Sequence, residues 1–369
     1  MKIPFVDLQR QYQQHKTEID QAIHEVLDQS NYIGGEKIKS FEEQFAKQCG
    51  TKHCIGVANG TDAIYITLKM LGIGEGDEVI TSACSWIATS ETISQTGAKP
   101  VFVDIGQDYL IDVEQIEYKI NSNTKAIVPV HLYGQMADMV AIKTIADKHD
   151  LIVVEDSAQA HLADRGGWSV GASSHAATFS FYPGKNLGAY GDAGGIVTND
   201  DQLAEKCRQF ANHGQLVKHQ HKIEGINSRL DTIQAAVLSV KLNNLSEWTS
   251  QRRKIAKQYN EALKGVSALR LPLVNTNSNP VYHLYVVSAE NREELQEYLK
   301  NHNISTAIHY PTPLPFLECY QFMNHTKEDF PIAHAESGKI LSLPIFPEMT
   351  TEEVSYVCNH IKGFYSGLL

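Results

Sequence analysis

The 369-residue sequence has no excess of basic residues, because 32 lysines and arginines stand against 43 aspartates and glutamates. The formal net charge is −11. Binding to nucleic acid or to an anionic membrane surface needs a broad basic face, so we expect neither partner. The sequence also has no apolar run near the roughly 18 residues of a membrane helix. Its N-terminus turns polar too early for a signal peptide, and we therefore expect a cytoplasmic protein.

Cysteine pairs and metal-ligand spacings are missing as well. The six cysteines are scattered without a CxxC pair, which predicts buried thiols in a reduced compartment. Histidines gather at 213–221 without the carboxylate or cysteine partner of a zinc site, so we predict no metal. The phosphate loop GxxxxGK[ST] is absent, which excludes a P-loop nucleotide-binding protein.

Extended and helical segments alternate along the first two thirds of the chain. Short apolar runs predict strands at 54–58, 78–82, 99–104, 125–133, 151–156, 177–181 and 194–199. Amphipathic spacing predicts helices at 8–28, 36–48, 61–72, 87–96, 112–120 and 138–149. Continuous apolar strands that alternate with helices are typical of a mostly parallel sheet covered on both faces, so the predicted fold class is α/β.

The pattern changes near residue 229, where a long charged helical stretch begins and runs to Gly265. A strand at 283–289, a helix at 291–301, a proline-rich loop at 311–315 and a terminal helix near 351–365 follow. With a hinge near Ser246, these elements predict a large domain over residues 1–245 and a small α+β domain over residues 246–369.

Polar and glycine-rich residues follow the predicted strands, where ligands bind in open α/β sheets. Gly60 and Thr61 open a helix whose free amides suit a phosphate, and the alternative, which this turn taken alone favours, is an ordinary helix cap by an Asn or Thr side chain. Asp156 ends an apolar strand and needs a cationic or donor partner, because an unpaired buried charge is costly. Lys185 lies in a loop rich in glycine and aromatic residues that can desolvate its amine.

Together these residues predict a pyridoxal phosphate site. This cofactor needs a lysine to bind it covalently, an acid to keep its ring nitrogen protonated, a phosphate cup and a flat partner for its ring. Lys185, Asp156, the Gly60–Thr61 turn and Trp86 are the respective candidates.

Four motifs resemble the signatures of the sugar aminotransferases of the DegT/DnrJ/EryC1/StrS family. They are ANGTDA at 58–63, EDSAQAH at 155–161, SFYPGKNLGAYGDAGG at 180–195 and GINSRLD at 225–231. The resemblance covers nearly the whole chain, and the motifs follow the order of the family. It implies a PLP-dependent transferase of fold type I, the aspartate aminotransferase-like fold.

The resemblance also implies roles for single residues at the cofactor. Lys185 would form a Schiff base with pyridoxal 5'-phosphate and later shuttle the proton, while Asp156 would pair with the ring nitrogen. Gln159 would bind the ring 3-oxygen and Trp86 would stack on the ring. The phosphate would be bound by Ser180, Gly60 and Thr61, and by Asn227 of a second subunit. A homodimer with shared active sites is therefore implied.

The implied reaction is a transamination in which L-glutamate donates the amine to a nucleotide-linked keto sugar. Lys185 stands where dehydratase relatives have a histidine, which favours transamination. Asp192 and the segments 217–221 and 307–315 resemble enzymes that act at C3. We expect a dTDP-linked 6-deoxyhexos-3-ulose as substrate, for polysaccharide or glycoconjugate biosynthesis. The alternatives are a UDP-linked 3-keto sugar or uronate, a 4-keto sugar, and a non-catalytic regulatory protein of the same fold.

Five residues are candidates for contacts with the substrate. Tyr182, His309 and Tyr310 are candidates to line the sugar pocket, and Lys218 and Arg229 are candidates to meet the diphosphate. The alternative for Tyr310 is packing of its loop, and for Arg229 it is a helix cap or an ion pair with Asp231.

Overall fold

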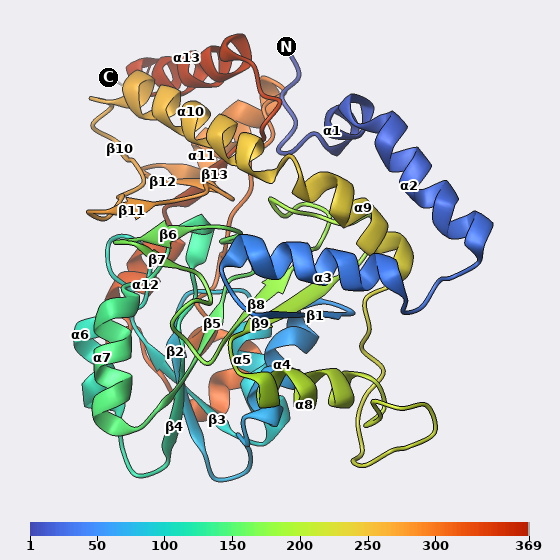
Figure 1. Cartoon of the computed structure of the whole chain (residues 1–369). Helices are drawn as coiled ribbons and strands as arrows, with labels where there is room; N and C mark the ends of the chain where they lie inside the picture. The colour runs from blue at the N-terminus through green and yellow to red at the C-terminus, as the bar shows by residue number, and fades with distance from the viewer. Residues whose placement is uncertain (368–369) are drawn as a thin grey trace.

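A seven-stranded sheet lies at the centre of the protein, in a computed structural model that describes residues 1–367 (Figure 1). Its strands are β1 (His53–Val57), β2 (Glu78–Ser82), β3 (Lys99–Val103), β4 (Thr124–Val128), β5 (Ile152–Asp156), β8 (Ala176–Ser180) and β9 (Gly194–Thr198). They lie in the order β1-β9-β8-β5-β4-β2-β3. Among these strands β9 alone runs opposite to the other six, so the predicted mostly parallel α/β sheet is confirmed.

Helices cover both faces of this sheet (Figure 1). One face is covered by α3 (Glu36–Cys49), α7 (Met139–His149) and α9 (Thr232–Leu242), and the other by α4 (Gly60–Met70), α5 (Ala88–Thr96) and α8 (Asp201–Ala211). Neighbouring strand residues point to opposite faces, so Val153 packs in the core under α3 while Val154 packs in the core under α4 and α5. Strands buried on both faces explain the continuous apolar runs in the sequence.

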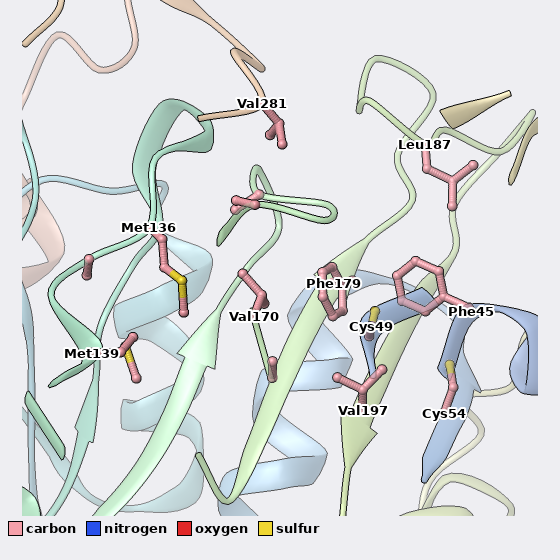
Figure 2. Close-up of a cluster of buried hydrophobic side chains, with 14 of the residues drawn as sticks. Phe45, Cys49, Cys54, Met136, Met139, Val170, Phe179, Leu187, Val197 and Val281 are labelled. Carbon is pink, nitrogen blue, oxygen red and sulfur yellow. The ribbon is translucent and has the colours of Figure 1, made fainter. Parts of the chain in front are cut away.

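Aromatic and sulfur-containing side chains fill the core beneath α3, as Figure 2 shows. Phe45 and Cys49 of α3 face Phe179 of β8, and the Phe45 and Phe179 rings meet edge to face at 5.0 Å between centroids. The prediction of buried thiols is confirmed for five of the six cysteines. It is wrong for Cys319, which is exposed because it lies in a short 3₁₀ helix at the surface.

A second core lies around a small antiparallel sheet of β10 (Leu269–Arg270), β12 (Tyr285–Ala289) and β13 (Ile340–Leu343). Helices α10 (Leu245–Leu263), α11 (Arg292–Asn301) and α13 (Thr351–Gly367) pack against it. Ile3 from the N-terminus also belongs to this core and pairs with Ile304. The N-terminal residues thus lie with the C-terminal part of the chain, and the division at 245/246 stays a prediction.

Two predicted helices are interrupted in the structure. The predicted helix 8–28 consists of α1 (Leu8–Gln14) and α2 (Lys16–Gln29), which separate at His15, whose ring packs against Trp248. The helical stretch from 229 is split into α9 and α10 by Asn243 and Asn244. A tertiary contact of His15 thus accompanies the first break, and the second lies close to the hinge expected near Ser246.

The remaining elements are short or were not predicted. They are α6 (Val113–Ile116), α12 (Pro331–Ser337), β6 (Asp164–Arg165), β7 (Trp168–Ser169), β11 (Ser278–Asn279), and the 3₁₀ helices η1 (Glu117–Lys119), η2 (Leu132–Gly134), η3 (Leu314–Phe316) and η4 (Glu318–Met323). The predicted strand 125–133 ends at Val128 because Pro129 has no N–H for the ladder. No helix in residues 1–367 is long and apolar enough to span a membrane.

Candidate active site

Several of the predicted cofactor residues meet at one edge of the central sheet. Asp156 is the last residue of β5, Ser180 is the last residue of β8, and Gly60 begins α4 just after β1. Strands β1, β5 and β8 all run in the same direction, because β1 and β8 both pair antiparallel with β9 and β5 is parallel to β8. Their carboxyl ends therefore meet at the edge where ligands bind in such sheets.

The first turn of α4 lies directly against Ser180. A methyl group at Gly60 would lie 2.6 Å from Cβ of Ser180, so only glycine permits this approach. A methyl group at Gly194 would likewise lie 2.2 Å from the carbonyl oxygen of Asn59. Asn59 Oδ1 accepts a hydrogen bond of 2.8 Å from the amide of Asp62, so the expected helix cap is present. Beside it, free amides and the Ser180 hydroxyl form a cradle that suits a phosphate.

Asp156 is buried and receives two hydrogen bonds from its own chain. Thr89 Oγ1 donates to Asp156 Oδ2 over 2.6 Å, and the amide of Ala158 donates to Oδ1 over 3.2 Å. The Ser85 hydroxyl lies 2.7 Å from Thr89 Oγ1 and must be the donor there, because Thr89 has already given its only hydroxyl hydrogen. The sequence predicted a partner for Asp156 but did not identify Thr89.

Lys185 follows β8 in a tight turn, in which its amide donates to the carbonyl of Tyr182 over 2.8 Å. Burial lowers the pKa of its amine to about 8, and the attraction of Asp156 opposes this shift. Asp156 therefore has Lys185 as a cationic neighbour, as the sequence predicted. An amine with a lowered pKa is partly uncharged near neutral pH and can act as a nucleophile.

Gln159, Tyr310 and Trp86 lie together. Gln159 Oε1 accepts a hydrogen bond from the amide of Tyr133 over 2.7 Å, and its Nε2 donates to the Tyr310 hydroxyl over 3.1 Å. The Tyr310 ring lies 5.5 Å from the Trp86 ring, and 58% of Trp86 is exposed. An amide nitrogen has two hydrogens, so Gln159 keeps one for a ligand. Trp86 presents an open aromatic surface beside it.

Three histidines lie close enough to Lys185 for its charge to lower their pKa. Burial, assisted by the charge of Lys185, lowers the pKa of His309 to about 4 and that of His161 to about 3. His309 Nδ1 lies 2.8 Å from Ser342 Oγ, and His161 Nε2 lies 3.0 Å from the carbonyl of Ser180. His283 has a lowered pKa for the same reasons. The sequence singled out His309 but gave no role to His161 or His283.

Three predicted residues lie in the loop 212–231 between α8 and α9, which projects from the body of the protein (Figure 1). Lys218 and Asn227 are exposed. The Arg229 guanidinium donates to Oδ1 of Asn212 over 2.7 Å and to Oδ1 of Asn227 over 2.8 Å. No described hydrogen bond joins this loop to Lys185. Tyr182, in contrast, lies in the turn of Lys185 and is 59% exposed.

Comparison with known proteins identifies the family. The model of the DegT/DnrJ/EryC1/StrS aminotransferase family matches residues 13–362. The chain belongs to this family. It is 46% identical over 363 residues to the dTDP-3-amino-3,6-dideoxy-alpha-D-galactopyranose transaminase of Aneurinibacillus thermoaerophilus, covering 98% of this chain and 99% of that one. It is equally 46% identical over 368 residues to a protein of Geobacillus stearothermophilus named pleiotropic regulatory protein, with 99% of each chain covered.

Comparison with solved structures also points to sugar aminotransferases. The structure of DesV from S. venezuelae in complex with a ketimine intermediate has a TM-score of 0.97 at 41% identity, covering 99% of this chain and 98% of that one. Other relatives, at 38–42% identity, are named as transaminases of dTDP-linked or UDP-linked sugars. The protein is therefore a PLP-dependent nucleotide-sugar aminotransferase of fold type I, and the predicted fold class and cofactor are confirmed.

The residues at the sheet edge fit this cofactor. The cradle of Gly60 and Ser180 offers phosphate donors, Lys185 offers an amine, and Asp156 offers a carboxylate oriented by Thr89. Within residues 1–367 no cluster of three or more histidine, cysteine or acidic side chains could hold a metal ion.

Proposed function

We propose that the protein transfers the amino group of L-glutamate to C3 of a nucleotide-linked 3-keto sugar, with a dTDP-6-deoxyhexos-3-ulose as the preferred substrate. The names of four relatives support C3, because each contains a 3-amino, 3-oxo or 3-dehydro sugar. Two of these names contain a UDP-linked sugar, so a UDP-linked 3-keto sugar or uronate is the second candidate. The product would enter polysaccharide or glycoconjugate biosynthesis.

The observation that carries the proposal is the meeting of three groups at one sheet edge: the buried amine of Lys185, the carboxylate of Asp156 whose charge acts on it, and the Gly60–Ser180 cradle. Pyridoxal phosphate, when bound, withdraws electrons from the carbon that carries the amine. Lys185 would hold the cofactor and, once released, take and return the proton at that carbon through Nζ. Asp156 would keep the ring nitrogen protonated, and Gln159 would donate to the ring 3-oxygen through its second amide hydrogen.

The substrate side of the site follows from the exposed groups. Tyr182 is exposed in the turn of Lys185, Trp86 is exposed beside Tyr310, and Tyr310 also contacts Gln159. His309 is held uncharged by burial, so it would bind a sugar hydroxyl as a neutral group. A diphosphate needs cations on this acidic protein, and we assign that role to Lys218 and Arg229.

An assay of the purified protein tests this function. The lysine-linked cofactor absorbs visible light, and the K185A variant should lose that band and all transamination. With glutamate as donor, mass spectrometry should detect an amino sugar from a dTDP-linked 3-keto sugar, and less or none from UDP-linked 3-keto or dTDP-linked 4-keto sugars. Turnover by K185A would contradict the role of Lys185. A preference for a 4-keto sugar would contradict the assignment of C3.

We further propose that two copies of the chain share their active sites, with Asn227 and Lys218 serving the partner's cofactor and substrate. Three large apolar side chains in their loop are exposed, Leu216 at 41%, Val217 at 57% and Ile223 at 41%, as expected for a surface that another chain covers. Arg229 occupies Oδ1 of Asn227, which leaves the amide hydrogens of Asn227 free to bind a phosphate.

Subunit complementation tests this sharing. Co-expressed K185A and N227A chains would form mixed dimers in which one site carries both defects and the other carries none. Random pairing should then restore about a quarter of wild-type activity. The control pair K185A and D156N should restore none, because both residues serve the site of their own chain. Equal inactivity of the two pairs would show that Asn227 serves its own subunit.

A further inference from the structure

A short segment at 281–284, which we call the strap, links the two cores just before β12. The amide of Val281 donates to the carbonyl of Gly134 over 2.8 Å, and Leu284 donates to the carbonyl of Tyr133 over 3.3 Å. A methyl group at Gly134 would lie 2.9 Å from the amide nitrogen of His283, so the strap and this turn touch. Figure 2 shows Val281 entering the top of the large core.

On its other side the strap is held by Arg252 of α10. The buried guanidinium donates to the carbonyls of Tyr282 and His283 over 3.1 and 3.4 Å, and to the carbonyl of Ile345 over 3.0 Å. Burial lowers the pKa of Arg252 to about 10, which leaves it charged at neutral pH. Hydrogen bonds from a charged donor are strong, and Nη1 of Arg252 shares its two hydrogens among these three carbonyls. Arg252 therefore joins the strap to α10 and to Ile345 of the small core.

The loop of Lys185 is tied to this strap through the neighbouring residue Asn186. Asn186 Nδ2 donates to the carbonyl of Val281 over 3.0 Å, which turns its Oδ1 toward His283 Nδ1 at 3.2 Å. An amide oxygen only accepts, so Nδ1 of His283 carries the ring hydrogen and Nε2 keeps a lone pair. Within residues 1–367 Nε2 of His283 has no hydrogen-bond partner.

We propose that Asn186 and His283 are positioning residues that hold Lys185 in its desolvated place and link it to the small core through the strap. The inference rests on Lys185 binding the cofactor, as proposed above. Asn186 is covalently next to Lys185, so its two bonds fix the backbone from which the amine extends. His283 is uncharged through burial and through its nearness to Lys185, so it meets Asn186 as a neutral hydrogen-bond donor.

The pH dependence of Schiff-base formation tests this inference: the cofactor is added to the cofactor-free enzyme and the growth of the visible band is followed at each pH. Formation needs the uncharged amine of Lys185. Freeing the loop would hydrate that amine and move its pKa toward the ordinary value, so N186A and H283Q should each raise the apparent pKa of formation by about 0.5–1 unit. Each should lower kcat about three- to tenfold with little change in the KM for the sugar. H283N keeps a donor near the position of Nδ1 and should resemble the wild type.

Two controls separate positioning from a general loss of structure. N199A removes an asparagine that also makes two backbone hydrogen bonds, to Lys52 and Ala172, and should leave the titration unchanged. The double variant N186A/H283Q should shift the pKa no more than the larger single variant, because both break the same contact.

The possible results are distinct. Additive shifts, or a titration in N186A and H283Q equal to that of the wild type, would overturn the inference while leaving the proposed function intact. A wild-type protein without a visible band, or a band that survives in K185A, would overturn the proposed function itself. If H283Q does not fold, N186A and H283N test the inference without it: N186A should shift the apparent pKa and H283N should not.

Discussion

Replacing Thr89 by valine removes one hydroxyl from the buried chain that leads from Ser85 to Asp156. Valine has nearly the shape of threonine, so the α5 backbone and the packing around it stay in place. Asp156 Oδ2 would lose the donor that now lies 2.6 Å away, and the Ser85 hydroxyl would lose its acceptor at 2.7 Å. The carboxylate itself stays buried, with the amide of Ala158 as its remaining described donor.

The expected loss of stability in T89V follows from the two hydrogen bonds that the Thr89 hydroxyl makes. A hydrogen bond to a charged group contributes about 1.5–3 kcal/mol, and a bond between two hydroxyls contributes about 0.5–1.5 kcal/mol. T89V should therefore lower the free energy of unfolding by about 2–4 kcal/mol. It should also weaken cofactor binding, because Asp156 would no longer be held in one rotamer.

Urea unfolding of the cofactor-free protein measures the first effect, and release of the cofactor on dilution measures the second. The matched control is T92V on the same helix, because Thr92 is equally buried but donates to the carbonyls of Ala88 and Thr89. Those carbonyls belong to the helix backbone, so T92V should cost under about 1 kcal/mol and leave cofactor binding unchanged. Equal losses in T89V and T92V would refute the reasoning.

Two further perturbations test the cradle and the buried lysines. G60A places a methyl group 2.6 Å from Cβ of Ser180, so it should cost about 1–3 kcal/mol of stability and weaken cofactor binding at least about tenfold. G74A, at a site whose nearest atom is 3.8 Å away, is the control, and equal cofactor affinity in both variants would contradict the cradle. Burial lowers the pKa of Lys241, which donates to the carbonyl of Gly188 in the Lys185 loop, to about 8. The unfolded chain keeps this proton to about pH 10.5, so wild-type stability should rise between these values, by an amount on the order of 3 kcal/mol for this lysine. K241M should flatten that rise in urea titrations from pH 7 to 10, and an unchanged slope would show that Lys241 does not titrate as described.

Much of the site could be predicted because its residues follow strand ends. Asp156 and Ser180 end two apolar strands, and Gly60 opens the helix after a third. Parallel strands bring their carboxyl ends to one edge of the sheet. Residues that end such strands can therefore be predicted to lie close together, even when they are far apart in sequence. The motif around Lys185 then pointed to the cofactor, which the family comparison confirmed.

Other contacts at the site could not be predicted, because nothing in the neighbouring sequence indicates them. Thr89 sits within an ordinary helix, and its bond to Asp156 spans 67 residues of sequence. The bond between Asn186 and His283 spans 97 residues. Within the long helical stretch the sequence suggested a hinge near Ser246, and the structure ends α9 at Leu242 and begins α10 at Leu245.

The sequence by itself determined the strand and helix pattern, the acidic charge, the loop of Lys185 and the acid at the end of β5, since each depends on neighbouring residues in the chain. The tertiary structure alone decided that Thr89 orients Asp156. It also decided that Arg252 holds the strap beside Asn186 and that Ile3 joins the C-terminal core. These contacts join residues far apart in sequence, and the side chains that make them are ordinary in their own segments. Only the packing of whole elements brings them together.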